Sequence, residues 1–252
     1  MGARSRRATA RRDAGMTLTE LMVVMLIMGI VVAATATLTI GMSRTTGQNV
    51  ARQDQIDVAR AAVERISKTT RTAVKPSQLL SSCSVSCAEV DAFLQGKNLS
   101  VKFYANLDNP GNSVGPSQVT YTIATSGADA GVLIEKVQRP DSNIPTSSGY
   151  AYCNAEVAGA TSACRSRLTV RRVAPGVSTA KPVFAYFAGN GDPLIPVASG
   201  LSAADLEKVL AIEVTLTVRS ASPTAPRPTT YIQRITLPNA QAVMQQGEDA
   251  TP

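Results

Sequence analysis

The chain has 252 residues, 44% of them hydrophobic, which is enough for one sizeable core and a separate apolar segment. It contains no histidine and no tryptophan, so Ser-His-Asp and Cys-His catalysis are excluded and a typical zinc site is not expected. The formal net charge of +7 is typical of proteins that bind nucleic acids or membranes. Much of this charge is local, because five arginines precede Gly15 with only Asp13 to offset them: Arg4, Arg6, Arg7, Arg11 and Arg12. Bulk charge therefore gives little support to DNA binding.

An apolar segment follows the arginine cluster. Leu21 to Ile40 contains no charged residue, and at about 1.5 Å per residue this length spans a hydrocarbon core about 30 Å thick. No comparable positive block follows the segment. The positive-inside rule then predicts a single-pass protein of the cytoplasmic (inner) membrane, with its N-terminus inside and its C-terminal body outside.

Two ordinary interpretations compete for this segment. One is a secretory signal peptide, for which Ala34-Thr35-Ala36 would supply a small-residue cleavage site. The other is a generic single-pass anchor. Neither explains Glu20 at the mouth of the apolar run, because a carboxylate drawn into a bilayer is costly and usually marks function. A snorkelling interfacial residue is the remaining alternative for Glu20.

Residues 14–24, AGMTLTELMVV, closely resemble the class III signal of type IV pilins and pseudopilins. The resemblance implies that a prepilin peptidase cuts between Gly15 and Met16 and that Met16 becomes the N-methylated N-terminus. Glu20 is then the fifth mature residue, which in the family is thought to neutralise the N-terminal ammonium of a neighbouring subunit. Such a charge pair adds little stability in a low dielectric, but it can fix the axial position of one subunit relative to the next. The chain departs from the family pattern in its long leader and in Met16, where Phe is more frequent.

The same resemblance implies a structural, non-catalytic subunit of an extracellular or periplasmic filament. Its expected partners are other pilin or pseudopilin subunits, the prepilin peptidase, an assembly ATPase, an inner-membrane platform protein and, before assembly, membrane lipid. No catalytic residue, cofactor or metal is expected. The rival hypotheses are an exported or anchored binding protein that does not polymerise, and a DNA-uptake (competence) pseudopilin, for which DNA would be a partner that we do not favour. The signal does not distinguish pilus, secretion and competence machines.

An amphipathic helix is predicted from Val50 to Val74. Its apolar positions recur every three to four residues, with charged residues largely on the rest of the wheel. Lys75-Pro76 is expected to end it. Gly41 and Gly47 are either flexible joints or points at which the helix extends locally. The core stripe comprises Ile56, Ala59, Val63, Ile66 and Ala73, with Thr70 filling one gap.

The remainder of the chain has strand composition separated by turn-rich breaks. These segments predict a mostly antiparallel sheet packed on the helix, an α+β fold of pilin-like architecture. A short helix capped by Ser202, with Asp205 facing back, is also expected. The predicted strands are 99–107, 118–124, 131–137, 167–173, 182–187, 210–219 and 229–237.

The predicted organisation has five parts. They are a cleaved leader at 1–15, a membrane and filament-core helix at 16–42, an amphipathic helix at 43–76, a β-rich extracytoplasmic domain at 77–238 and a disordered tail at 239–252. Val209 to Leu237 resembles the closing hairpin of J-type minor pseudopilins, although a generic minor pilin is an alternative. The length of the chain also favours a minor subunit.

Four cysteines, Cys83, Cys87, Cys153 and Cys164, all follow the membrane segment, and an even count in an exported domain favours disulfides. Three connectivities are open, and we expect the sequence-local pairs Cys83–Cys87 and Cys153–Cys164.

Two other groups are candidate sites. The segment 189–192, Gly-Asn-Gly-Asp, offers oxygens for calcium but only one carboxylate, so a turn is favoured. An aromatic and basic neighbourhood could contact DNA but is more typical of an exposed strand face; it comprises Tyr150, Tyr152, Arg165, Arg167, Arg171 and Arg172.

Overall fold

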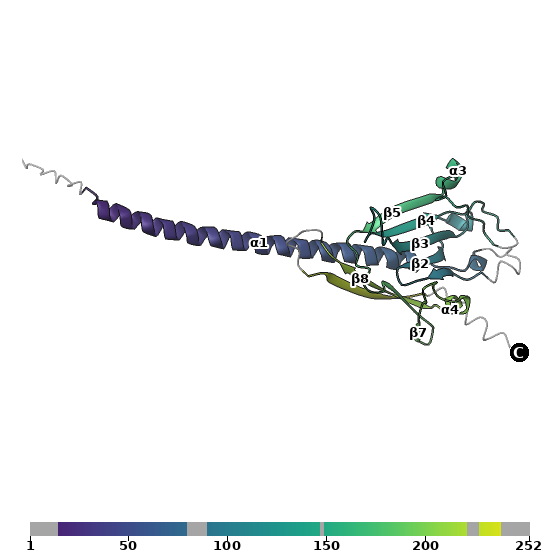
Figure 1. Ribbon diagram of the computed structural model, residues 1–252. Helices are drawn as coiled ribbons and strands as arrows, with labels where there is room; N and C mark the ends of the chain where they lie inside the picture. Colours follow the sequence, from purple (N-terminus) through teal and green to yellow (C-terminus); the bar gives the residue numbers. More distant parts are fainter. Residues whose placement is uncertain (1–14, 80–89, 147–148, 221–226, 238–252) are drawn as a thin grey trace, which may run out of the picture. The chain divides into compact units, whose positions relative to one another are not determined.

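The computed structural model describes residues 15–79, 90–146, 149–220 and 227–237. The chain divides into two compact units, Met1–Gln48 and Asn49–Pro252. A continuous helix, α1 (Leu18–Thr70), begins in the first unit and ends in the second (Figure 1). The predicted tail and most of the predicted leader lie outside the described residues.

The N-terminal part of α1 is a regular helix despite its threonines. Thr35, Thr37, Thr39 and Thr45 each donate their hydroxyl to a carbonyl of the preceding turn, at 2.8–3.0 Å. These hydroxyls therefore need no water, which suits an apolar environment. The helix also runs through Gly41 and Gly47 without a break.

The C-terminal part of α1 belongs to the second unit and packs in its core through one stripe, which contains Ala59, Val63 and Ile66 as predicted. The stripe begins differently from the prediction, because Gln55 is buried whereas Ile56 is only half-buried. The side-chain amide of Gln55 lies 3.1 Å from the hydroxyl oxygen of Thr229, the first residue of the last strand. This polar contact begins the buried stripe, where we predicted the apolar side chain of Ile56.

The helix ends at Thr70, ahead of the Lys75-Pro76 stop that we predicted. Beyond it the backbone turns to pair with the sheet: Val74 N–H donates to the Tyr104 carbonyl, and Asn106 N–H donates to the Thr72 carbonyl. Ala73 forms an isolated bridge with Ala105. Sheet hydrogen bonds thus replace those of another helical turn, and Pro76 instead begins the 3₁₀ turn η1 (Pro76–Gln78).

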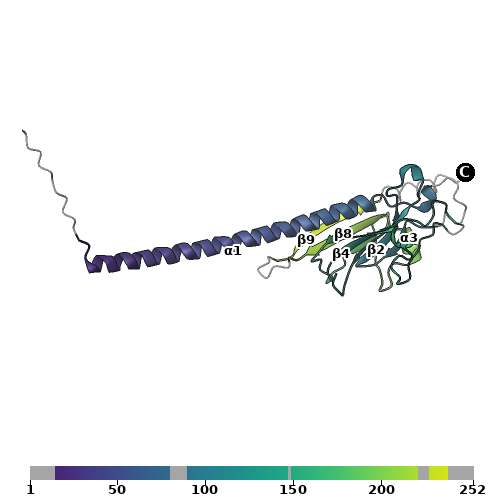
Figure 2. The ribbon, with the colours of Figure 1, turned by 90° about the horizontal axis from the view of Figure 1, so that it is seen from above.

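The β-strands form two antiparallel sheets rather than the one that the sequence predicted (Figures 1 and 2). The first has the order β1-β2-β3-β4-β5, and its strands are Phe93–Gly96, Ser100–Ala105, Ser117–Ile123, Leu133–Gln138 and Leu168–Ala174. The second has the order β7-β6-β8-β9, with β6 at Phe184–Phe187, β7 at Pro193–Leu194, β8 at Ala211–Val218 and β9 at Thr229–Thr236. Seven strands fall at predicted segments. The short strands β1 and β7 were missed.

One core joins the helix to both sheets. Figure 1 shows the C-terminal part of α1 between strands β2 to β5 and strand β8, and Figure 2 shows β8 and β9 running along the helix. Val63 and Ile66 from the helix, Phe103 and Leu133 from the first sheet and Leu216 from the second belong to one cluster of buried side chains. The architecture is therefore α+β, with a long N-terminal helix and antiparallel sheets.

Three short elements complete the description: η2 (Pro110–Asn112), α3 (Ser162–Arg165) and α4 (Ala203–Glu207). Ser202 caps α4 as predicted, since its hydroxyl accepts a hydrogen bond from Asp205 N–H.

Candidate functional site

The N-terminal end of α1 is held by a capping box. Thr17 Oγ1 accepts a hydrogen bond from Glu20 N–H at 3.3 Å, and the Glu20 carboxylate accepts bonds from the N–H of Thr17 at 2.9 Å and from its hydroxyl at 3.0 Å. These bonds satisfy backbone donors that a helix start otherwise leaves free. Thr17 therefore caps the helix, which begins at Leu18, and Glu20 lies in its first turn.

Gly15 and Met16 lie just before this cap, outside the helix and exposed to solvent. A Cβ built on Gly15 would meet nothing within 4 Å. The Gly15–Met16 peptide bond thus lies outside regular secondary structure between two exposed residues, where a peptidase could reach it.

The helix behind the cap is covered by no other described part of its unit. Its large apolar side chains between Leu18 and Ile40 are 49–72% exposed. Among the described residues, α1 is the one helix that is long enough and apolar enough to cross a membrane, judged by length and composition. An apolar surface of this extent requires lipid or other apolar helices around it.

Residues 10–36 match the family model of the prokaryotic N-terminal methylation motif. This chain carries the signature of type IV pilins and pseudopilins. No curated protein and no solved structure matches the chain.

The pilin signature spans the peptide bond at Gly15, the capping box and the first part of the apolar helix. It supports processing by prepilin peptidase and interaction with other pilin subunits, and together with the apolar helix it fits a membrane-anchored pilin. The sequence analysis singled out Gly15, Met16 and Glu20 as candidate site residues but did not single out Thr17. The Thr-x-x-Glu spacing ahead of an apolar run was the signal that would have revealed the cap.

A buried charge cluster in the second unit was not predicted at all. Glu135 on β4 is 2% exposed, and its carboxylate accepts hydrogen bonds from Arg65 on α1 and from the Tyr121 hydroxyl on β3. Arg171 on β5 lies 3.9 Å away. Burial and this hydrogen bond raise the pKa of Tyr121, so the phenol remains a donor. The cluster ties the helix to three strands and has a structural role.

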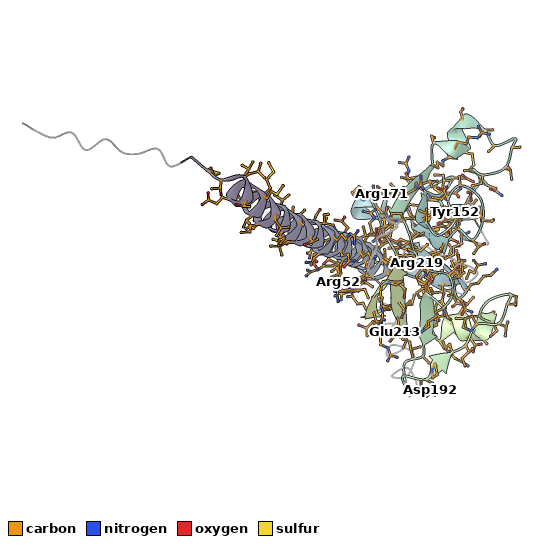
Figure 3. The ribbon with its side chains drawn as sticks, turned by 60° about the vertical axis from the view of Figure 1, so that its left-hand side comes forward. Arg52, Tyr152, Arg171, Asp192, Glu213 and Arg219 are labelled. Carbon is orange, nitrogen blue, oxygen red and sulfur yellow. A yellow bond between two sulfur atoms is a disulfide. The ribbon has the colours of Figure 1, made fainter. Side chains whose placement is uncertain are left out.

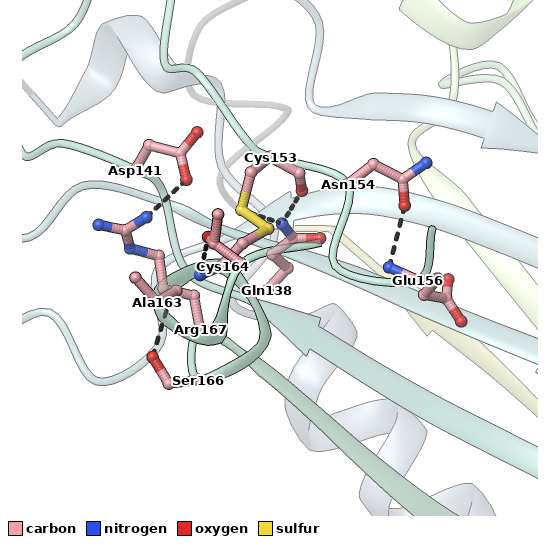
Figure 4. The surroundings of a disulfide bond; sticks show 10 residues. Gln138, Asp141, Cys153, Asn154, Glu156, Ala163, Cys164, Ser166 and Arg167 are labelled. Carbon is pink, nitrogen blue, oxygen red and sulfur yellow. Dashed lines mark hydrogen bonds and ion pairs between the residues drawn. A yellow bond between two sulfur atoms is a disulfide. The ribbon is translucent and has the colours of Figure 1, made fainter. Parts of the chain in front are cut away.

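The predicted disulfide Cys153–Cys164 is present, and it joins residues on either side of a surface loop (Figure 4). Gln138 on β4 donates its side-chain amide to the carbonyl of Cys153, which fixes the loop to the first sheet. Cys83 and Cys87, the other predicted pair, lie outside the described residues.

The segment 189–192 forms the turn between β6 and β7. Ala188 N–H donates to the Asp192 carbonyl, and the side chains of Asn190 and Asp192 bond to each other at 2.6 Å. Within the described residues, no three His, Cys, Asp or Glu side chains form a group that could hold a metal ion.

The structure does not bring the aromatic and basic neighbourhood together as one surface. Tyr150 is buried, and Tyr152 donates its hydroxyl to the Pro116 carbonyl at 2.5 Å. Arg171 on β5 is the cross-strand partner of Glu135 on β4 and lies on the same face of the sheet. Its neighbour Arg172 lies on the opposite face and pairs with Asp129 at 3.0 Å. Arg171 belongs to β5, whereas Tyr152 belongs to the loop before α3 (both are labelled in Figure 3). The tyrosines are therefore not placed to stack on bases beside the arginines.

Proposed function

We propose that this chain is a non-catalytic, minor structural subunit of a type IV pilus-like or type II secretion pseudopilus filament. The observation that carries the proposal is the spacing of the methylation motif on the structure: an exposed Gly15–Met16 bond, then Glu20 in the first turn of an uncovered apolar helix. A separate prepilin peptidase would cut this bond and Met16 would be N-methylated. The anchor helices of several subunits would then bundle, with Glu20 setting their register.

Charge and redox chemistry support a membrane orientation with the N-terminus in the cytoplasm and the second unit outside. The leader holds five arginines and would stay in the cytoplasm, while the second unit would lie outside. A disulfide at Cys153–Cys164 is consistent with that compartment, because such bonds persist in oxidising surroundings. An assembly ATPase and an inner-membrane platform protein would supply the work of extension.

A J-type minor pseudopilin is the subfamily that we favour. The helix α4 leads into the hairpin β8–β9, and this order supports the resemblance seen in the sequence. This assignment rests on a pattern of elements and is secondary to the filament proposal.

Intact-mass and N-terminal peptide mass spectrometry of the protein from its host membranes tests the proposal. We expect a mature chain that begins at methylated Met16. A chain that begins after Ala36, or one that still begins at Met1, would contradict it and favour an exported or anchored binding protein that does not polymerise.

A further inference from the structure

The outer face of the first sheet carries a polar pocket beneath the disulfide-linked loop. Its volume is about 300 Å³, at the lower end of the range of small-molecule sites. Two cross-strand rows form its floor: Lys102–Thr120–Lys136, and beside it Gln118–Gln138–Leu168. These residues lie on the face opposite Glu135, so the pocket is separate from the buried charge cluster.

The loop from Tyr152 to Glu156 forms one wall of this pocket and is fixed at several points. The ring of Tyr152 lies 5.8 Å from that of Tyr104, and Gln138 holds the Cys153 carbonyl. Glu156 pairs with Lys136 at 2.5 Å. Figure 4 shows Gln138, Cys153, Asn154 and Glu156 on this side of the domain. A ring contact, a hydrogen bond and an ion pair thus connect this wall of the pocket to the first sheet.

Lys102 distinguishes the pocket from an ordinary polar surface. Its side chain is half-buried, and among the described residues its ammonium makes no ion pair within 4.0 Å. Burial lowers the pKa of Lys102, and the more distant Glu156 opposes this shift only in part. A half-buried cation without a carboxylate partner is favourable to an anionic ligand.

The rest of the lining indicates what kind of anion would fit. Two ammonium groups and one carboxylate give the lining a net charge of +1, which suits a single carboxylate better than a phosphate near −2. Gln118, Thr120 and Asn154 add groups that both donate and accept hydrogen bonds, and these match hydroxyls. We propose that this pocket binds a small hydroxylated carboxylate, of the class of acidic monosaccharides, with the carboxylate on Lys102.

Ligand-observed saturation-transfer NMR on the full chain in detergent micelles tests the proposal. The probes are D-galacturonate, its neutral counterpart D-galactose and inorganic phosphate. We expect saturable binding of galacturonate, with galactose at least tenfold weaker. Lys102→Gln should weaken galacturonate binding at least tenfold, because a charge-assisted hydrogen bond is lost. Lys181→Gln makes the same charge change at an exposed residue outside the pocket and should leave the affinity within about twofold.

Glu156→Gln is a second variant, and it should change the affinity for galacturonate in the opposite direction. It removes the carboxylate of the lining and should strengthen galacturonate binding. A thermal melt of each variant shows whether the domain is folded. The proposal fails if folded wild-type protein binds no galacturonate, if Lys102→Gln binds it as well as the wild type does, or if phosphate binds in its place.

Discussion

Arg65 on α1 and Glu135 on β4 form a two-point ion pair, with the Arg65 Nη2 atom 2.8 Å from Glu135 Oε2 and Nε 3.0 Å from both carboxylate oxygens. The pair is asymmetric, because the side chain of Arg65 is 41% exposed whereas that of Glu135 is 2% exposed. The hydrogen bond to Glu135 raises the pKa of Arg65, so the guanidinium is charged at every physiological pH. The helix therefore supplies the main counter-charge for a carboxylate buried in the sheet.

This asymmetry predicts unequal effects of removing each partner. Arg65→Met should cost about 3 kcal/mol of unfolding free energy, since it leaves a buried carboxylate without its main partner. Glu135→Gln should cost less, about 1–2 kcal/mol, because Arg65 can turn to water. Urea unfolding of the full chain in detergent measures both values. The matched control is Arg60→Met, which breaks an exposed ion pair with Glu64 and should cost less than about 1 kcal/mol. Equal losses in Arg65→Met and Arg60→Met would contradict this account.

Gly176 predicts a second strong effect on stability. It has a φ of +71°, and a Cβ placed there would lie 2.2 Å from the Arg219 carbonyl oxygen. Arg219 N–H donates to the Gly176 carbonyl and Val177 N–H to the Gly131 carbonyl, so this segment links the two sheets. Gly176→Ala should cost about 2–4 kcal/mol through left-handed strain and the clash. Gly159→Ala, which meets nothing within 4 Å, should stay within about 0.5 kcal/mol. A Gly176→Ala protein as stable as the control would contradict the predicted strain and clash.

Alkaline pH should destabilise the domain through its buried tyrosines. Burial raises the pKa of Tyr121 and Tyr186 above the ordinary phenol value. Above about pH 10 the unfolded chain loses phenolic protons that the folded chain keeps. The contribution of these tyrosines to the unfolding free energy is therefore constant below that pH and falls above it. Phenolate absorbance and circular dichroism, followed together during titration, should show these tyrosines ionising only as the domain unfolds. Tyr186→Phe should reduce the slope; ionisation of both phenols in a fully folded domain would refute the prediction.

Glu20 should affect assembly and leave processing intact. Glu20→Ala removes one half of the capping box and the carboxylate proposed to set register, whereas the Gly15–Met16 bond is unchanged. We expect normal N-terminal cleavage by mass spectrometry but no incorporation into filaments sheared from cells. Thr17→Ala is the matched control, since it removes the other half of the cap at a cost of about 1 kcal/mol but keeps the carboxylate. If both variants assemble equally poorly, helix capping and not the charge is what matters.

The chain's own sequence determined the features that depend on local order. The methylation signal, the uncharged segment Leu21–Ile40, most strands and the Ser202 cap are all patterns of neighbouring residues, whose physical cause is short-range. The same applies to the Cys153–Cys164 pair, which the chain order places close together.

Tertiary structure decided what depends on residues distant in sequence. The division into two sheets, the end of α1 at Thr70 and the burial of Gln55 in place of Ile56 each depend on partners far along the chain, such as Tyr104 and Thr229. Arg65 and Glu135 are 70 residues apart in the sequence. Lys102 lies beside its pocket neighbours only because of the register in which the strands pair. No periodicity encodes such pairings, because packing and sheet register, not local propensity, set which side chains meet.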